Sequence, residues 1–182
     1  MPYSHIVSRG YLHYAIILHN PNEKFAVRFP SYRITARDKN DQIIGTDDQV
    51  LSINYPQQDF VYGTLGFSVE QQPAKVEFQA LELRDSNIVA AEVLEHPIFV
   101  PLEIVGATKR DKSILGEVRN PNTYDIDKAI VTVIFRDDDN IIVGRLTFID
   151  IFSAGGKTPF EIRVYKDVAT DNYDVYANIW SY

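Results

Sequence analysis

Histidines are the residues of this chain best suited to acid–base chemistry, and there are four of them: His5, His13, His19 and His96. Nucleophilic catalysis needs a histidine beside a serine, threonine or cysteine, with an acid that orients the ring. The sequence has no cysteine and no Gly-x-Ser-x-Gly elbow. His13 and His19 share one face of a predicted strand, but extended chain places them about 20 Å apart, too far to bind one metal ion. We therefore predict no catalytic residue and no cofactor.

The strongest cluster of carboxylates is Asp137, Asp138 and Asp139, followed by Asn140. Clustered carboxylates can bind calcium. The cluster lacks the glycine and the distal glutamate of an EF-hand loop, and a polar hairpin turn explains it without a ligand. Its counterpart in the first half, Asp38-Lys39-Asn40-Asp41, has a lysine in place of one carboxylate. We favour the turn and keep the three aspartates as a weak calcium candidate, with no other metal site predicted.

Aromatic side chains are the remaining candidates for ligand binding, with 11 tyrosines, 10 phenylalanines and one tryptophan. Tyr55, Phe60 and Tyr62 flank a predicted loop. If they face outward they could bind sugar rings or a protein partner, because aromatic rings give a large contact area at little entropic cost. Packing between domains is the alternative, and we favour it for Trp180.

These residues must be positioned by short strands, because apolar and polar residues alternate between polar turns and no long helical period competes. In Tyr11–His19, for example, Tyr14, Ile16 and Leu18 lie on one face, with His13 and His19 on the other. The other predicted strands are His5–Ser8, Tyr32–Arg37, Gln42–Gly45, Val50–Tyr55, Phe60–Phe67, Lys75–Leu83, Pro101–Ala107, Ser113–Arg119, Ala129–Arg136, Ile141–Gly144, Leu146–Phe152, Phe160–Tyr165 and Tyr173–Trp180.

A tripeptide that ends a strand occurs twice, as Asn20-Pro21-Asn22 and Asn120-Pro121-Asn122. Proline cannot donate to a ladder and asparagine bonds nearby backbone in turns, so each copy stops a strand and starts a loop. The copies are 100 residues apart here and 99 apart at the following Arg-Asp…Gly sequence. This recurrence predicts two homologous all-β domains, residues 1–90 and 91–182, each an antiparallel β-sandwich.

The join between the predicted domains lies within Asp85–Phe99, where Ala90–Glu95 has a helix-forming composition that Pro97 would end. A short linker between like sandwiches suggests an elongated tandem with a modest interface.

A strand ending in Asn-Pro-Asn, then a strand, an acidic turn and a returning Ile-Ile-Gly, resembles the LEA14/WHy type of immunoglobulin-like sandwich. The second copy is closer to the FxLYD-type domain of bacterial exported proteins. That resemblance is carried by Ile114-Leu115-Gly116-Glu117-Val118-Arg119-Asn120, Phe135-Arg136-Asp137-Asp138-Asp139, and Phe152-Ser153-Ala154-Gly155-Gly156 before Pro159-Phe160. The first copy departs from this pattern: Ile16 stands where Gly116 does, and Pro56-Gln57 replaces the Gly-Gly turn.

The resemblance implies two seven-stranded sandwiches of the kind borne by lipoproteins and cell-envelope proteins, and it supplies no catalytic residue. It favours an extracellular or cell-surface protein whose leader, with a lipid anchor upstream of Met1, is absent here. A native start at Met1 would instead make the protein cytoplasmic. The leading hypothesis is a non-enzymatic structural spacer or protein-interaction module. The alternative is a carbohydrate-binding module of the cell wall that uses exposed tyrosines.

Charge and composition argue against a nucleic-acid partner and against a transmembrane segment. The net charge is −7, and residues 1–96 carry 8 basic and 12 acidic side chains against 10 and 13 in residues 97–182. Neither half forms a basic patch, so we predict no nucleic-acid partner. No stretch approaches the roughly 20 apolar residues of a membrane span, so we predict no transmembrane segment.

Overall fold

The structure is a computed structural model that describes residues 3–8, 10–64, 66–137, 140–164 and 171–180, with the backbone alone for 3–6, 8, 137, 140–142 and 151–152. Its N-terminal half contains β1 (Tyr3–Ser8), β2 (Tyr11–His19), β3 (Phe25–Arg28), β4 (Ser31–Arg37), β5 (Ile43–Val50), β6 (Ile53–Asn54), β7 (Asp59–Gly63), β8 (Phe67–Ser68), β9 (Lys75–Ala80) and β10 (Ile88–Ala90). Its C-terminal half contains β11 (Glu103–Arg110), β12 (Ser113–Arg119), β13 (Ile126–Asp137), β14 (Asn140–Phe152), β15 (Lys157–Arg163) and β16 (Tyr173–Ile179).

The strands form antiparallel sheets, so the predicted all-β fold is confirmed. In the N-terminal half, β5-β4-β9 make an outer N sheet and β1-β2-β7, with β8 on β2, make an inner N sheet. In the C-terminal half, β14-β13-β16 make an inner C sheet and β11-β12-β15 make an outer C sheet. A small sheet, β10-β3-β6, closes one end of the N-terminal half.

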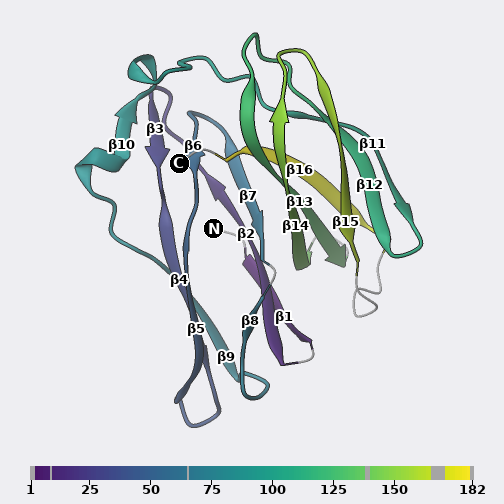
Figure 1. Ribbon diagram of the computed structural model, residues 1–182. Coiled ribbons are helices and arrows are strands. Elements are labelled where there is room, and N and C mark those ends of the chain that lie inside the picture. Colours follow the sequence, from purple (N-terminus) through teal and green to yellow (C-terminus); the bar gives the residue numbers. More distant parts are fainter. Residues whose placement is uncertain (1–2, 9, 65, 138–139, 165–170, 181–182) are drawn as a thin grey trace.

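The four main sheets stack in the order outer N, inner N, inner C, outer C, and the two halves stand side by side (Figure 1). Tyr14 and Ile16 of the inner N sheet pack against Ile34 of the outer N sheet. Phe135 of the inner C sheet packs against Phe160 of the outer C sheet. Each half therefore has the two-layer core of a β-sandwich.

The two inner sheets pack on each other along a seam, so the expected elongated tandem with a modest interface is wrong. Ala15, Val61 and Ile134 form a buried apolar cluster in this seam. The hydroxyl of Thr132 donates a 3.1 Å hydrogen bond across it to the carbonyl of Val61. At one end, Trp180 lies 6.1 Å from the ring of Phe60, which confirms the predicted packing role of the tryptophan.

The central strands are buried on both faces, which explains why the halves do not separate. Alternate residues of β13, such as Val133, face the outer C sheet, while Ile130 and Ile134 face the seam, and all are fully buried. In β2 the face predicted to be polar is also covered, because His13 and Ala15 are buried. Only sheets with a layer on each side have strands of this kind.

The outward faces of the two outer sheets carry ion pairs. On the outer N sheet, Arg33 bonds both carboxylate oxygens of Asp48 at 2.6 Å, and Arg37 bonds Glu77 at 2.8 Å. On the outer C sheet, Arg119 pairs with Glu103 at 3.0 Å and Lys157 with Glu117 at 3.4 Å. The stack therefore ends in a charged face on each side.

Several predicted strand limits differ from the observed ones for local reasons. Residues Ile43–Val50 form one strand, because Gly45 lets the backbone pass under Phe67 and Val69 without interruption. The predicted helix at Ala90–Glu95 is a single 3-10 turn over Ala91–Val93, and a second turn covers Asp85–Asn87. The short strands β3 and β10, which pair with each other, were not predicted.

Strands β1–β10 pair among themselves, as do β11–β16, in the part of the chain that the structure describes. The apolar clusters, however, contain residues of both halves. Division into two domains therefore stays a prediction. None of the described helical segments has the length and apolarity needed to cross a membrane.

Candidate functional site

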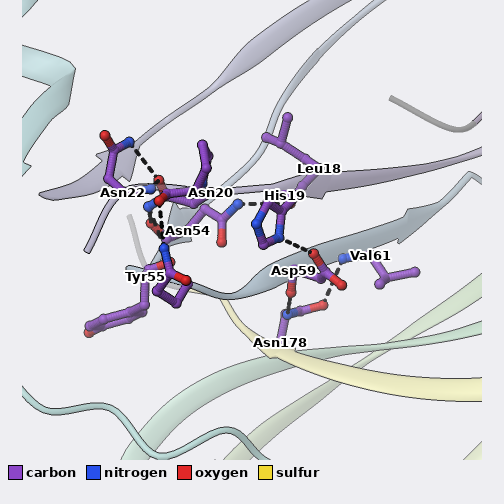
Figure 2. Close-up of polar contacts among 11 residues, drawn as sticks. Leu18, His19, Asn20, Asn22, Asn54, Tyr55, Asp59, Val61 and Asn178 are labelled. Carbon is purple, nitrogen blue, oxygen red and sulfur yellow. Dashed lines mark hydrogen bonds and ion pairs between the residues drawn. The ribbon is translucent and has the colours of Figure 1, made fainter. Parts of the chain in front are cut away.

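At the end of β2, polar side chains join the asparagine turn to neighbouring segments of the N-terminal half and to Asn178 of the C-terminal half (Figure 2). Asn20 follows this strand and is buried. Its Nδ2 donates to the carbonyls of Phe25, Asn54 and Tyr55 at 2.9, 3.0 and 3.1 Å. Its Oδ1 accepts from the backbone N–H and the Nδ2 of Asn22, at 3.1 and 2.7 Å. One side chain thus joins the strand end, the loop and the neighbouring strand.

The second tripeptide repeats this arrangement at the end of β12. Asn120 is buried, and its Nδ2 donates to the carbonyls of Tyr124 and Ser153 at 2.8 and 3.4 Å. Its Oδ1 accepts from the N–H and the Nδ2 of Asn122, both at 3.0 Å. The loop carbonyl is five residues on in the first copy and four in the second, so this loop contains the one-residue difference between the repeats.

A histidine–carboxylate pair lies beside the first turn. Nδ1 of His19 is 2.8 Å from Oδ1 of Asp59, and both side chains are about half exposed. Among the described residues, the structure gives the His19 ring no hydroxyl partner. The pair therefore has a base and an orienting acid, the arrangement that catalytic triads complete with a nucleophile.

The edge of β7 is covered by one side chain from the other half. Asn178 of β16 donates from Nδ2 to the carbonyl of Asp59 at 2.9 Å and accepts on Oδ1 from the N–H of Val61 at 3.0 Å (Figure 2). An amide side chain here takes the place of a neighbouring strand and satisfies the exposed ladder groups. Nothing in the sequence pattern distinguished Asn178, because its role depends on a strand more than 100 residues away.

The linker between the halves, residues 94–102, lies at this junction. It runs along a groove of about 380 Å³, whose lining includes Gln58, Asp59, Phe99, Leu102, Val175 and Asn178. The side-chain amide of Gln58 donates to the carbonyl of Phe99 at 3.1 Å. The Phe99 ring stacks on Tyr55 with centroids 4.7 Å apart. These contacts fix the linker to the N-terminal half.

The three aromatic residues predicted as a ligand platform do not face outward. Tyr55, Phe60 and Tyr62 are only 6, 1 and 7% exposed. Phe60 and Tyr62 pack in one buried apolar cluster and Tyr55 in another. The condition for ligand binding, that these rings face outward, is therefore not met.

A polar network inside the N-terminal half uses tyrosines instead. Tyr14 donates its hydroxyl to Asp47 at 2.8 Å, Gln49 donates to the same carboxylate at 3.1 Å, and Tyr62 donates to Gln49 at 2.9 Å. Burial raises the pKa of Tyr62 to about 12 and raises the pKa values of Tyr14 and Tyr32 as well. These hydroxyls are therefore neutral at ordinary pH, and those of Tyr14 and Tyr62 donate the hydrogen bonds just described.

The weak calcium candidate cannot be placed as a site. The side chain of Asp137 and all of Asp138 and Asp139 lie outside the described residues. Within the described residues, no group of three histidine, aspartate or glutamate side chains is arranged to hold a metal ion.

Comparisons with known proteins give little further information. No protein-family model matches the chain, and no curated protein matches its sequence. Among solved structures, Bacteroides uniformis β-glucuronidase is similar with 14% identity over 85% of this chain and a TM-score of 0.23. Bacteroides uniformis β-glucuronidase 2 bound covalently to cyclophellitol-6-carboxylate aziridine gives 15% identity over the same share, also at 0.23. The chain spans 21% of the length of these enzymes. A likeness this low supports no conclusion on function.

Proposed function

We propose that this protein is a non-enzymatic module of the bacterial cell envelope that acts as a rigid spacer or a protein-interaction module. The observation that supports this role is the seam between the inner sheets. Backbone of Gly63 lies directly against backbone of Gly144 there, so the halves touch without intervening side chains. A body built in this way holds its two ends at a fixed separation.

The linker adds to this rigidity. Gln58 and Tyr55 hold Phe99 on the N-terminal side, and Asn122 holds Val100 on the C-terminal side. Linkers of flexible tandem domains are exposed and make few contacts. The envelope setting of the proposal rests on the FxLYD-type resemblance of residues 114–120, 135–139, 152–156 and 159–160.

Sugar binding is not included in the proposal. Stacking on a sugar needs an exposed ring face. The tyrosines predicted for that purpose are buried, as described above.

Urea unfolding of the full chain tests the rigid-body role. Trp180 is the one tryptophan and lies in the seam, so its fluorescence reports separation of the halves, whereas far-UV circular dichroism reports both sandwiches. We expect the two signals to change in one coincident transition. Loss of the fluorescence signal at lower urea than the dichroism would show a weak seam and refute the rigid spacer.

Antibody labelling of intact source cells tests the envelope setting independently. We expect the protein to be labelled without permeabilisation. Labelling that requires permeabilised cells would refute the envelope role.

A further inference from the structure

A pocket of about 470 Å³ lies where the small sheet, the linker and the end of β16 meet. Its walls include Arg28 and Ile53 of the small sheet, Leu94 and Glu95 of the linker, and Ile179 of β16. The pocket shares no lining residue with the groove beside Asn178. Its volume is in the range of small-molecule sites, which is roughly 300–1,000 Å³.

Two side chains of opposite charge line this pocket without pairing. Among the described residues, Arg28 and Glu95 form an ion pair neither with each other nor with another group. The Arg28 guanidinium lies over the ring of Phe29, 5.2 Å from its centroid. Both charges are therefore available to a ligand, and bonds to charged groups are the strong ones in such sites.

The backbone holds Arg28 at the pocket wall in an uncommon conformation. Phe29, the next residue, has a φ of 53°, which a bulky side chain rarely adopts. The N–H of Phe29 donates to the carbonyl of Ser52 at 2.8 Å. The carbonyl of Arg28 accepts from Nδ2 of Asn87 at 3.0 Å. Strained residues persist where the surrounding structure fixes them, and they gather at functional sites. These bonds therefore fix the position from which Arg28 reaches the pocket.

Two tyrosines lie on the linker side of the pocket. Tyr55 lines it, is 6% exposed and makes no side-chain hydrogen bond with a described residue. Burial raises the pKa of Tyr55, and the carboxylate of Glu95 raises it further. Tyr124 stacks on the pocket residue His96 with ring centroids 3.5 Å apart, and its buried hydroxyl has no partner among the described residues. Tyr55 therefore offers a neutral hydroxyl near the Glu95 carboxylate.

We propose that this pocket binds a small zwitterion with an apolar body, the chemical class of an α-amino acid with a large apolar side chain. A ligand with a single charge would meet a like charge on one wall, because Arg28 and Glu95 both line the pocket. A zwitterion pairs its carboxylate with Arg28 and its ammonium group with Glu95. Its apolar side chain packs on Ile53, Leu94 and Ile179. This site goes beyond the spacer or interaction role proposed above and does not depend on it.

Isothermal titration calorimetry of the full chain with L-leucine tests the site. We expect saturable binding with a dissociation constant below about 1 mM. N-acetyl-L-leucine lacks the ammonium charge, L-leucinamide lacks the carboxylate and glycine lacks the apolar body. Each should bind at least about 10-fold more weakly than L-leucine, because each loses one of the three kinds of contact.

Variants with matched controls locate the bound ligand. Glu95→Gln should weaken binding of L-leucine at least about 10-fold, whereas Glu92→Gln, at an exposed position outside the pocket, should leave it unchanged. Arg28→Gln should also weaken it, with the exposed Arg110→Gln as its control. In Glu95→Gln the partner of the ammonium group is lost, so L-leucine and N-acetyl-L-leucine should bind about equally.

Absence of L-leucine binding to the wild type would overturn the proposal. Equal binding to the wild type, Glu95→Gln and Arg28→Gln would place the ligand elsewhere and also overturn it. Glu95 is exposed, so its variant tests the site even if Arg28→Gln fails to fold. Wild-type binding of N-acetyl-L-leucine as tight as that of L-leucine would refute the zwitterion. Failure of ligand binding together with a single urea transition would remove the site and leave the rigid-body role intact.

Discussion

Gly63 and Gly144 lie back to back across the seam, so close that a Cβ atom on Gly144 would be 2.6 Å from the Cα of Gly63. A Cβ on Gly63 would in turn lie 2.8 Å from the Cα of Gly144. The neighbours are backbone atoms, which cannot rotate away. The spacing of the two inner sheets is therefore set by the absence of two side chains.

Gly144→Ala should destabilise the protein through the seam. The added methyl group would also lie 2.9 Å from the Cβ of Ala15, so relief requires the sheets to move apart. Overpacking of this kind costs about 1–3 kcal/mol. Urea unfolding followed by Trp180 fluorescence should show a lower midpoint.

Gly155→Asn is the control for this change. Gly155 has open space around it and a φ of 68°, a conformation that asparagine tolerates. Its midpoint should remain near that of the wild type. Equal loss in both variants would mean that the seam is looser than the glycine contact indicates.

Asn178→Ala should weaken the hold between β16 and β7. It leaves the N–H of Val61 and the carbonyl of Asp59 without their amide partner. The N–H of Val61 belongs to a buried residue, and leaving such a group unpaired costs about 1–3 kcal/mol, whereas the carbonyl of Asp59 is at an exposed position where water can bond it. Hydrogen exchange should accelerate at Val61, and the exposed Gln72→Ala provides a neutral control. Unchanged exchange at Val61 would contradict the role of Asn178.

Asn122→Ala and Asn22→Ala form a matched pair on the two repeats. Both lose a bond to the first asparagine of the turn, but only Asn122 also holds the linker backbone at Val100. We expect Asn122→Ala to cost about 1–3 kcal/mol more than Asn22→Ala. Thermal unfolding and hydrogen exchange at Val100 measure the difference. Equal destabilisation would show that the linker does not depend on the amide.

Alkaline pH should destabilise the protein through Tyr62. Burial raises its pKa to about 12, against about 10 in an unfolded chain. A raised pKa contributes stability that is complete below pH 10 and is lost as the pH rises through 12. Tyr62→Phe should therefore flatten the fall of stability between pH 10 and 12, as measured by urea unfolding at each pH. If stability falls between pH 10 and 12 as steeply in Tyr62→Phe as in the wild type, Tyr62 is not the group responsible for the loss.

The sequence indicates the sandwich of each half well, because Tyr14, Ile16, Val133 and Phe135 recur at strand period and all are buried. The repeat of Asn-Pro-Asn also correctly indicates a structural turn. These features depend on neighbours in the chain, which a sequence pattern records.

The seam was missed although the sequence contains a signal for it. Residues 12–18 and 129–135 are apolar in both phases with few exceptions, which is typical of strands covered on two faces. The comparison of repeats is sharper: Ile17 corresponds to Glu117, and Ile134 corresponds to Thr35. In the N-terminal half the sheet that contains β2 has an apolar outward face where its counterpart is polar. In the C-terminal half the sheet that contains β13 has the apolar outward face instead.

The candidate site was harder to predict. Asp47 and Gln49 occupy inward positions of β5 and bond Tyr14 and Tyr62. Polar residues at inward positions of a strand are the sequence signal from which this tyrosine network could have been predicted. The bridging role of Asn178 depends on contacts between segments far apart in the chain. Such contacts follow from how the halves pack, and no local period encodes them.

The charged outer faces have a consequence for assembly. The inner N sheet corresponds to the outer C sheet in the repeat, and the outer N sheet corresponds to the inner C sheet. The two inner sheets that pack together are therefore not equivalent, and the halves meet head to tail. A head-to-tail contact is open-ended and can add further units without limit. Here the next unit would have to desolvate Arg33 with Asp48 at one end, or Arg119 with Glu103 at the other. The cost of desolvating these ion pairs would oppose such growth, as polar capping units do in repeat proteins.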